Sequence, residues 1–311
     1  MNKLSEENRI KKRWIIYIAA IAVAGFIWNA GYSLCRRAFY IPQSARKITS
    51  TPGRALSVNA YEVNCPSSEG YLVPAWYNPG ENGAAVILLH GLGGTREQLA
   101  ELARFLMDNG YAVILPDQRG HGENPIPYTT YGRAESVDAL ACIDWLREQD
   151  GIDDSRIGIF GASMGAAAAI HAAARDENLG CLIADSSYSR ISEQAKNDLT
   201  YEKAPVKVPE IFHPLVLGVF RIYQPFFIGE YSNFPDPIES IVQVRCPVLL
   251  THGSDDTRIS PDNTDYLYIA ARDAGVDVAK SIVDGGGHCN YHRQDEFRRQ
   301  LLIVLNDSLL R

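Results

Sequence analysis

The sequence lacks the cysteine spacing that binds metal ions or builds a disulfide framework. The six cysteines are Cys35, Cys65, Cys142, Cys181, Cys246 and Cys289. No two of them form a Cys-x-x-Cys arrangement, and several fall in stretches that we expect to be core. Buried thiols are therefore favoured over a zinc site or disulfides. We expect no metal ion and no organic cofactor.

An excess of positive charge is also missing. Asp and Glu outnumber Lys and Arg by 37 to 30, which gives a formal net charge of -7 at pH 7. No basic patch with interleaved aromatic residues is visible, so nucleic acid is not expected as a partner. No internal repeat is visible either. The 46% hydrophobic content and the chain length suit one α/β domain behind an N-terminal segment.

Charge is absent from residues 14–28, and the uncharged stretch continues through Leu34. At 1.5 Å per residue, roughly 21 helical residues span about 30 Å, the thickness of the hydrocarbon core of a bilayer. Basic residues flank the stretch at 11–13 and 36–37. These features predict a single transmembrane helix.

The same features predict how the chain is organised. The predicted parts are a short basic N-terminus at 1–13, a transmembrane anchor at 14–34, a stalk at 35–57 and a catalytic domain at 58–311. A cleaved signal peptide is the alternative, but the apolar run is long and no small-x-small site follows it. A lipoprotein signal would need a small residue before the cysteine at 35, where leucine stands. Basic residues are about equally frequent on both sides, and we expect the catalytic domain to be extracytoplasmic.

Apolar strand-like runs alternate with helical stretches after residue 57. The first two expected strands, 58–63 and 71–77, flank a Pro-Ser-Ser-Glu-Gly turn, which predicts an antiparallel hairpin. The later expected strands are 84–89, 112–115, 157–160, 181–184, 248–251 and 280–283. The expected helices are 96–109, 136–149, 166–175 and 261–274. This alternation predicts an α/β fold with a mostly parallel central sheet and helices on both faces.

The alternation breaks between residues 186 and 241. This segment is rich in proline and aromatic residues, and a structureless loop of that length is uncommon inside a compact domain. We therefore predict a mostly helical cap insertion at about 186–241, over the candidate site. Its apolar side chains are expected to line a pocket, although some of them must bury the cap itself.

One serine lies at a junction between a strand and a helix. Gly161-Ala162-Ser163-Met164-Gly165 follows the apolar run 157–160 and opens an alanine-rich stretch at 166–174. A sharp turn there holds the serine in a strained conformation above the sheet, and the glycines leave room for strand and helix to approach. Ser163 is therefore the candidate nucleophile. The alternative is that it is only a small residue in a tight turn.

A nucleophilic serine needs a base to take its proton. Among the seven histidines, His288 follows a predicted strand and the glycines at 285–287, so we expect it on a flexible loop at a strand end. His292 is the competitor, and we expect it to belong to the terminal helix. His171 is expected to be a packed or surface residue of a helix. No role is predicted for His213, which falls in the cap.

Two adjacent aspartates follow the predicted strand at 248–251. A turn rarely lets both Asp255 and Asp256 face one histidine, so one orients the base and the other is solvated or caps the turn. The residues alone leave this choice open.

Glycines also follow the predicted strand at 84–89, in His90-Gly91-Leu92-Gly93-Gly94. Glycine lets backbone N–H groups turn towards a ligand oxygen. The backbone amides of Leu92 and Met164 are therefore the expected oxyanion donors. A phosphate cradle is the alternative, but the loop lacks the Lys-Ser/Thr of a P-loop and the Gly-x-Gly-x-x-Gly spacing.

From about residue 61 onwards the chain resembles the α/β-hydrolases, and most closely their serine esterase, lipase and acyl-peptidase-like branches. Besides the motifs above, Asp-Gln-Arg-Gly-His-Gly at 117–122 is similar to the family's Asp-x-Arg-Gly-His-Gly loop. The resemblance implies an α/β-hydrolase fold and a structural role for His121. It also implies Asp256 as the acid, because the family's carboxylate comes four residues after the histidine of a His-Gly pair.

The expected activity is hydrolysis of carboxylic esters of lipophilic or aromatic acyl groups through an acyl-enzyme intermediate. Ser163, Asp256 and His288 follow one another in the order that α/β-hydrolases use. The expected substrate is a small-molecule or lipid ester. A thioesterase or peptidase with the same triad is the alternative, and a non-catalytic membrane-anchored scaffold is the alternative of another class.

Overall fold

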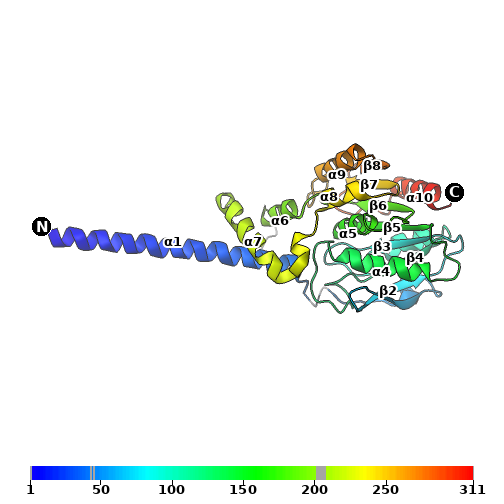
Figure 1. Cartoon of the computed structure of the whole chain (residues 1–311), viewed down its shortest axis with the longest axis horizontal. Helices are drawn as coiled ribbons and strands as arrows, with labels where there is room; N and C mark the ends of the chain where they lie inside the picture. The colour runs from blue at the N-terminus through cyan, green and yellow to red at the C-terminus, as the bar shows by residue number, and fades with distance from the viewer. Residues whose placement is uncertain (1, 43, 45, 201–207, 311) are drawn as a thin grey trace.

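The central element of the fold is an eight-stranded sheet (Figure 1). The computed structural model describes residues 2–42, 44, 46–200 and 208–310. The strands are β1 Tyr61–Pro66, β2 Leu72–Asn78, β3 Ala85–Leu89, β4 Ala112–Pro116, β5 Ile157–Ala162, β6 Cys181–Asp185, β7 Val248–Gly253 and β8 Val278–Val283. Their order in the sheet is β1-β2-β4-β3-β5-β6-β7-β8. β1 and β2 pair antiparallel, as do β2 and β4, and all other neighbouring strands are parallel.

All eight predicted strands are present, and the predicted mostly parallel α/β fold is confirmed. The differences lie at the ends of elements. The first strand begins at Tyr61, because the residues before it form a turn in which the Ala60 N–H donates to the Ser57 carbonyl. The helix predicted at 96–109 is shorter, since residues 96–99 form turns ahead of α3 Ala100–Met107.

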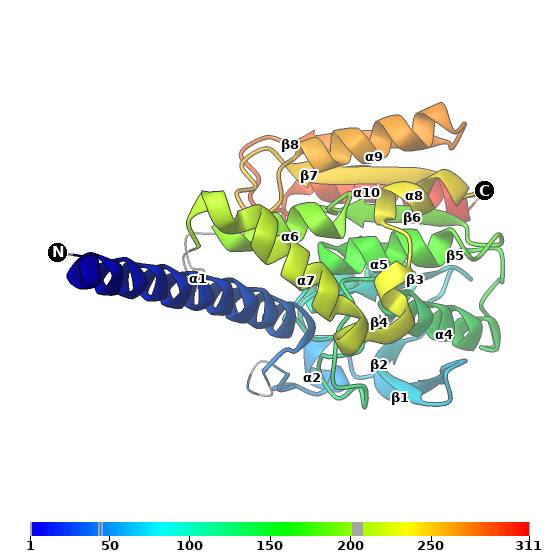
Figure 2. The same cartoon turned by 60° about the vertical axis from the view of Figure 1, so that its left-hand side comes forward.

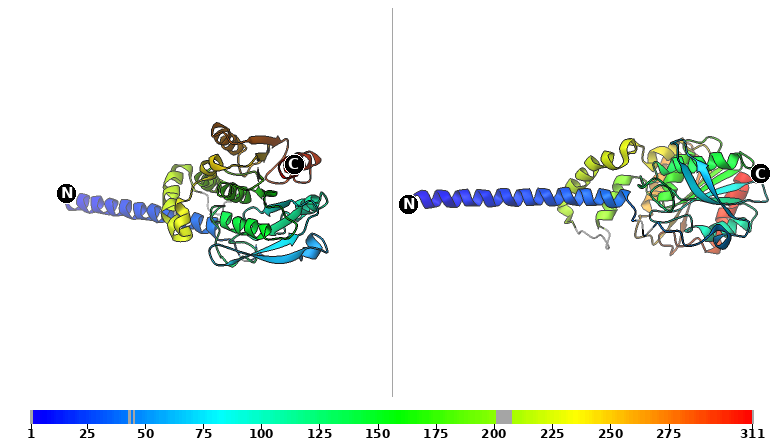
Figure 3. Two further views of the ribbon diagram at one scale, coloured as in Figure 1. Left: turned by 45° about the vertical axis from the view of Figure 1, so that its right-hand side comes forward. Right: turned by 90° about the horizontal axis from the view of Figure 1, so that it is seen from below.

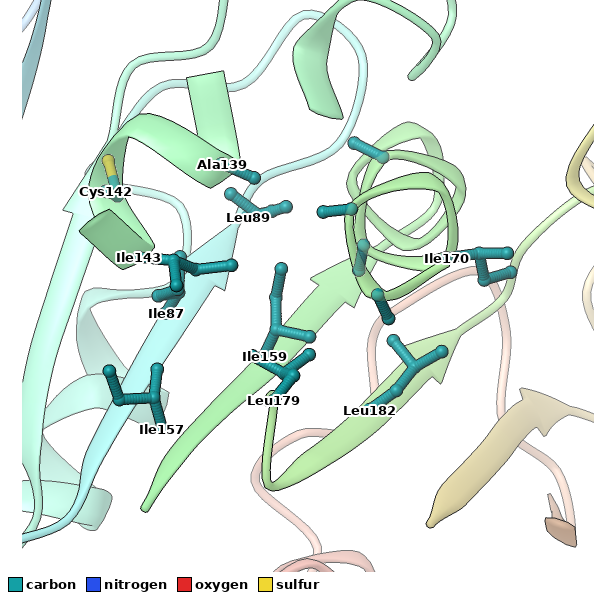
Figure 4. Packing of buried hydrophobic residues seen from close by; sticks show 14 of the residues in the cluster. Ile87, Leu89, Ala139, Cys142, Ile143, Ile157, Ile159, Ile170, Leu179 and Leu182 are labelled. Atoms are coloured by element: carbon teal, nitrogen blue, oxygen red, sulfur yellow. The ribbon is translucent and has the colours of Figure 1, made fainter. Parts of the chain in front are cut away.

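Helices cover both faces of the sheet. One face carries α4 Glu135–Arg147, α5 Met164–Ala173 and α9 Asp262–Asp273, and the other carries α3 and α10 Asp295–Leu309. Along β3, Ile87 and Leu89 pack on the α4 and α5 side, whereas Val86 and Leu88 pack on the α3 side. Figure 4 shows Ile87 beside Ile143 of α4. Because the central strands are buried on both faces, their sequences are continuous apolar runs.

The segment between β6 and β7 is helical over most of its described residues. Its elements are α6 Ile191–Thr200, η2 Glu210–Phe212, α7 His213–Ile228, η3 Gly229–Asn233, α8 Pro237–Ser240 and η4 Ile241–Gln243. Residues 201–207 of the predicted cap lie outside the described residues. Arg133 forms an ion pair of 3.2 Å with Asp236, which ties the end of this segment to the loop before α4.

The N-terminal segment is a single helix, α1 Asn2–Phe39, which projects from the sheet domain (Figures 1 and 3). Its residues Glu7–Phe39 have the length and apolar composition of a candidate membrane span. The helix continues five residues beyond the predicted end of the anchor at residue 34. Cys35 and Phe39 in this extension are fully buried, so packing stabilises its last turns.

Helix α7 packs across the C-terminal part of α1 (Figure 2). The two helices approach closely at Gly31, where an added Cβ would lie only 2.5 Å from Cγ1 of Val219 in α7. Farther along, the rings of Phe39 and Phe220 stack at a centroid distance of 5.8 Å. Small residues permit such close approach between helices, as they do in membrane helix pairs. The α1–α7 pair is thus a specifically packed unit.

This contact predicts the effect of enlarging Gly31. A Gly31→Leu variant is expected to push α7 away from α1 and to destabilise the protein by about 1–3 kcal/mol, because the added side chain meets Val219. The measurement is thermal unfolding of the full chain in detergent. Gly25→Leu is the matched control, since it adds the same side chain to the same helix where no atom lies within 4 Å of the new Cβ. Equal melting temperatures for the two variants would contradict the predicted packing.

Candidate active site

Ser163 lies at the sharp turn between β5 and α5. Its φ of 56° and ψ of -116° put a non-glycine residue in a strained region. The flanking glycines make the turn possible. A Cβ at Gly161 would lie 2.1 Å from the carbonyl oxygen of Gly165, and one at Gly165 would lie 2.2 Å from that of Leu89. The Ser163 N–H donates to the Asp185 carbonyl over 2.8 Å, so β6 fixes the turn.

The loop after β8 brings His288 to this serine. His288 Nε2 lies 2.9 Å from Ser163 Oγ, and its Nδ1 lies 2.7 Å from Oδ2 of Asp256. With the ring proton on Nδ1, the histidine donates to the carboxylate and accepts from the serine hydroxyl. The structure therefore brings together the three side chains that the sequence predicted as nucleophile, base and acid.

Asp256 is held by more than the histidine. Its Oδ1 accepts the backbone N–H groups of Arg258 and Ile259 over 2.8 and 3.0 Å, and its Oδ2 also lies 3.1 Å from His252 Nε2. Burial alone would raise the pKa of Asp256, but hydrogen bonds from the two histidines outweigh it and hold the pKa well below its usual range. This carboxyl is therefore ionised at neutral pH.

The neighbouring Asp255 points elsewhere. Its side chain is exposed and its Oδ1 accepts the hydroxyl of Ser254 over 2.9 Å. Its backbone N–H donates to the Gly286 carbonyl over 2.8 Å, and this bond joins the loop that carries Asp256 to the loop that carries His288. The geometry thus distinguishes two aspartates that the residues alone left equivalent.

His252 is a site residue that the sequence did not single out. It is fully buried, and its Nε2 donates towards both Asp256 and the Ile259 carbonyl, the latter over 3.0 Å. Its Nδ1 lies 2.7 Å from Oγ1 of Thr264 at the start of α9. The sequence does contain a signal for this residue, because a histidine stands four residues before Asp256, in the His-Gly pair at 252–253.

His292 was expected in the terminal helix, and this prediction is wrong. α10 begins at Asp295, and His292 lies in the turn before it, with its Nε2 2.7 Å from Oδ2 of Asp185. The hydroxyl of Tyr291 also donates to Asp185, and Thr251 Oγ1 donates to it over 2.9 Å.

These contacts make Asp185 an anchor for the loop that carries His288. Burial alone would raise the pKa of Asp185, but the hydrogen bonds from His292, Tyr291 and Thr251 lower it overall. A buried, ionised carboxylate at the end of β6 therefore holds the residues that follow His288.

The remaining histidines have structural partners. His121 is buried, accepts the Gly93 N–H at its Nε2 over 2.9 Å and bonds the Arg119 carbonyl at its Nδ1 over 2.8 Å. It thus holds the glycine loop after β3 in place. His171 in α5 contacts the hydroxyl of Ser240 over 2.8 Å.

A small pocket opens beside the serine. Its lining residues are Leu92, Tyr131, Ser163, Met164, Tyr188, Gln194, Arg258 and Ile259. Both predicted oxyanion residues, Leu92 and Met164, are among them. Met164 is the first residue of α5, so its backbone N–H has no acceptor within the helix.

Within the described residues, no three His, Cys, Asp or Glu side chains come together as a candidate metal site.

Solved structures of known proteins share this fold. Residues 84–224 match a family model described as alpha/beta hydrolase fold. The Pyrococcus furiosus esterase Pf2001 is similar with a TM-score of 0.71 at 22% identity, over 87% of this chain and 98% of that one. A puromycin-hydrolyzing peptidase of Mycobacterium tuberculosis is similar with a TM-score of 0.64 at 20% identity, over 80% of this chain and 39% of that one. At these identities the likeness shows the fold alone.

Proteins with similar sequences match further parts of the chain. The uncharacterized protein Rv2307c of Mycobacterium tuberculosis is 30% identical over 277 residues, which cover 88% of this chain and 86% of the relative. Lysophosphatidylserine lipase ABHD12 of Mus musculus is 29% identical over 199 residues, which cover 58% of this chain and 44% of the lipase. With the sheet order, the serine turn and these relatives together, the chain belongs to the α/β-hydrolase superfamily.

Proposed function

We propose that this protein is a membrane-anchored serine hydrolase that cleaves carboxylic esters. The observation that carries the proposal is the continuous series of contacts from Ser163 Oγ through the His288 ring to Asp256, with distances of 2.9 and 2.7 Å. The fold by itself also hosts proteins without catalytic activity, so the proposal rests on these side chains and not on the fold.

The proposed reaction follows from the geometry. Ser163 Oγ attacks the ester carbonyl while His288 Nε2 takes its proton, and Asp256 stabilises the resulting imidazolium. The backbone N–H groups of Leu92 and Met164 stabilise the tetrahedral oxyanion. His288 then protonates the leaving alcohol, and a water molecule repeats the sequence on the acyl-enzyme to release the acid.

The pocket favours a lipophilic or aromatic acyl group. Four of its eight lining residues, Leu92, Tyr131, Tyr188 and Ile259, belong to or pack against one apolar cluster. A relative that is named as a lysophosphatidylserine lipase supports a lipid ester as one class of substrate.

The proposed organisation places this site beside a membrane. It consists of a basic N-terminus at 1–13, an anchor at 14–34, a stalk at 35–57 and a catalytic domain at 58–311 with a cap at about 186–241. The apolar stretch Glu7–Phe39 supports a single-pass anchor. We place the catalytic domain on the extracytoplasmic side.

The test uses the full chain purified in detergent. The protein is treated with a fluorophosphonate probe and assayed on p-nitrophenyl esters from acetyl to palmitoyl. Covalent labelling together with ester turnover is the expected result, because the probe reacts with serines activated by a general base. Parallel assays on matched acyl thioesters decide between an esterase and a thioesterase. Folded protein that neither labels nor hydrolyses any ester would contradict the proposal.

A further inference from the structure

The uncharged part of α1 that stands clear of the protein is too short to cross a bilayer alone. Residues 14–26 are exposed along their whole length, and burial begins at Ile27. At 1.5 Å per residue, 13 residues cover roughly 20 Å, whereas the hydrocarbon core is about 30 Å thick. An anchor that starts after Arg13 must therefore include the turns of α1 against which α7 packs.

The buried positions of α1 show where α7 lies. Ile27, Ala30, Gly31, Leu34, Cys35, Ala38 and Phe39 are the buried positions of this part of the helix. Their spacing of three or four residues describes one helical face, and the same apolar cluster contains Val216 and Phe220 of α7. Figures 1 and 3 show the N-terminal end of α7 farther from the sheet, along α1, than its C-terminal end.

The opposite face of α7 is apolar, and the part of the chain that the structure describes leaves it exposed. Leu215, Ile222 and Phe226 are exposed, the last by 81%. At 3.6 residues per turn they fall within about 40° of one another, so they form one stripe. Ile211 precedes them in η2 and is 80% exposed. Arg221 is also exposed on α7, about 100° around the helix from Ile222, and its long side chain can reach a polar surface.

The stripe is continuous with the exposed apolar surface of α1. Trp28 and Tyr32 of α1 both contact the ring of Tyr223 in α7, at centroid distances of 5.3 and 5.2 Å. Tyr223 in turn contacts Phe226 at 6.4 Å. A face of this kind, joined to an apolar helix that requires a bilayer, has the composition of a lipid-facing surface.

We infer that α7 lies in the near leaflet of the bilayer beside α1, as a second, non-spanning membrane element. The exposed face of α7 contacts the acyl chains of the lipids, because α1 must insert so deeply that α7, packed beside it, also enters the hydrocarbon region. The pocket then lies directly behind this embedded face. Tyr131, Tyr188 and Ile259 of the pocket wall belong to the same apolar cluster as the α1–α7 contact.

A consequence concerns the substrate, and it rests on the proposed function. The last residue of α1 is linked to the serine turn, since the Phe39 carbonyl accepts the Thr129 N–H over 2.9 Å and Thr129 Oγ1 lies 3.2 Å from Met164 Sδ. With the embedded helices bordering the site, ester substrates approach Ser163 from the leaflet as bilayer-resident amphiphiles.

The first test measures depth and needs no activity. Single cysteine variants Ile18→Cys in α1, Ile222→Cys in α7 and Ile303→Cys in α10 are labelled with an environment-sensitive fluorophore and reconstituted as full chains in phosphatidylcholine vesicles. Ile222 and Ile303 form a matched pair, because both are helical isoleucines with 54% exposure. Wild-type protein measures background labelling of the native thiols, of which Cys289 is the one that is only half-buried among the described residues.

Nitroxide-labelled acyl chains are expected to quench the labels at 18 and 222 several-fold more strongly than the label at 303, while aqueous iodide shows the reverse order. Lipid quenching at 18 with iodide quenching at 222 would overturn the inference and leave the anchor intact. Absence of lipid quenching at both positions would overturn the anchor as well. Protection at 222 from both quenchers would indicate a protein partner, such as a second copy, and would also overturn the inference.

The second test separates this inference from the proposed activity. Ile222→Asp is expected to lower hydrolysis of a long-chain ester embedded in vesicles by about tenfold or more, because a carboxylate is costly in hydrocarbon. It should leave turnover of soluble p-nitrophenyl acetate unchanged, and Ile303→Asp should change neither. Equal loss on both substrates, or loss on neither, would contradict membrane delivery. Wild-type protein that hydrolyses neither ester would contradict the proposed function but would not affect the conclusion from the depth measurement.

Discussion

A Ser163→Ala variant is expected to lose fluorophosphonate labelling and to lower kcat for ester hydrolysis by about 10⁴- to 10⁶-fold. The hydroxyl that would attack the ester lies 2.9 Å from His288 Nε2, and alanine removes it without adding volume to the turn. In the proposed mechanism Ser163 forms the bond to the acyl group, so without its hydroxyl the remaining groups would supply only binding and oxyanion stabilisation. The measurement compares initial rates on p-nitrophenyl esters and labelling in a gel.

Folding of the variant decides how that loss is interpreted. The Ser163 N–H that donates to the Asp185 carbonyl is a backbone group and survives the substitution, so the melting temperature should change little. Ser155→Ala, in the exposed turn before β5 and thus at the opposite end of that strand from Ser163, is the control for loss of a serine hydroxyl. Retained labelling in Ser163→Ala would point to another nucleophile and would reject the proposed role of the serine.

The strands and the serine turn were predictable because their signals are local. β3, β4, β5, β6 and β7 are short apolar runs, and each lies between turn residues or helical stretches that mark its ends. The turn at Ser163 was also marked locally, since only glycine fits at 161 and 165. Ends of elements shifted by a few residues where turns replaced the first residues of a predicted strand or helix.

The contacts that hold the site were not predictable in the same way. Asp185 meets His292, which lies 107 positions later in the sequence, through a pairing that only the folded sheet creates. The packing of α1 on α7 is of the same kind, because an apolar helix near the N-terminus gives no sign of its partner. A stalk was predicted from residue 35, whereas Cys35 and Phe39 continue the helix against α7.

Asp255 and Asp256 show most clearly that the residues alone do not determine which side chain faces the histidine. Substituting each of them is also expected to give the second large difference in activity. Asp256→Asn is expected to lower kcat/KM about 10⁴-fold. The asparagine amide would donate to His288 Nδ1, so the ring proton would move to Nε2. A protonated Nε2 cannot accept the hydrogen bond or the proton of the Ser163 hydroxyl. Asp255→Asn removes the same charge one residue away on an exposed side chain and is expected to stay within about twofold of wild type.

Comparing these two variants isolates the role of orientation from that of charge. Both substitutions remove one negative charge from the same loop, but only Asp256 lies 2.7 Å from the His288 ring. The pKa of Asp256 is held low by hydrogen bonds that outweigh its burial, so the carboxylate persists through mildly acidic pH. Wild-type activity lost on mild acidification is therefore not expected to arise from protonation of Asp256. Equal losses in the two variants, measured as kcat/KM on one ester with folding checked by circular dichroism, would show that the loop acts through its charge and would reject Asp256 as the orienting acid.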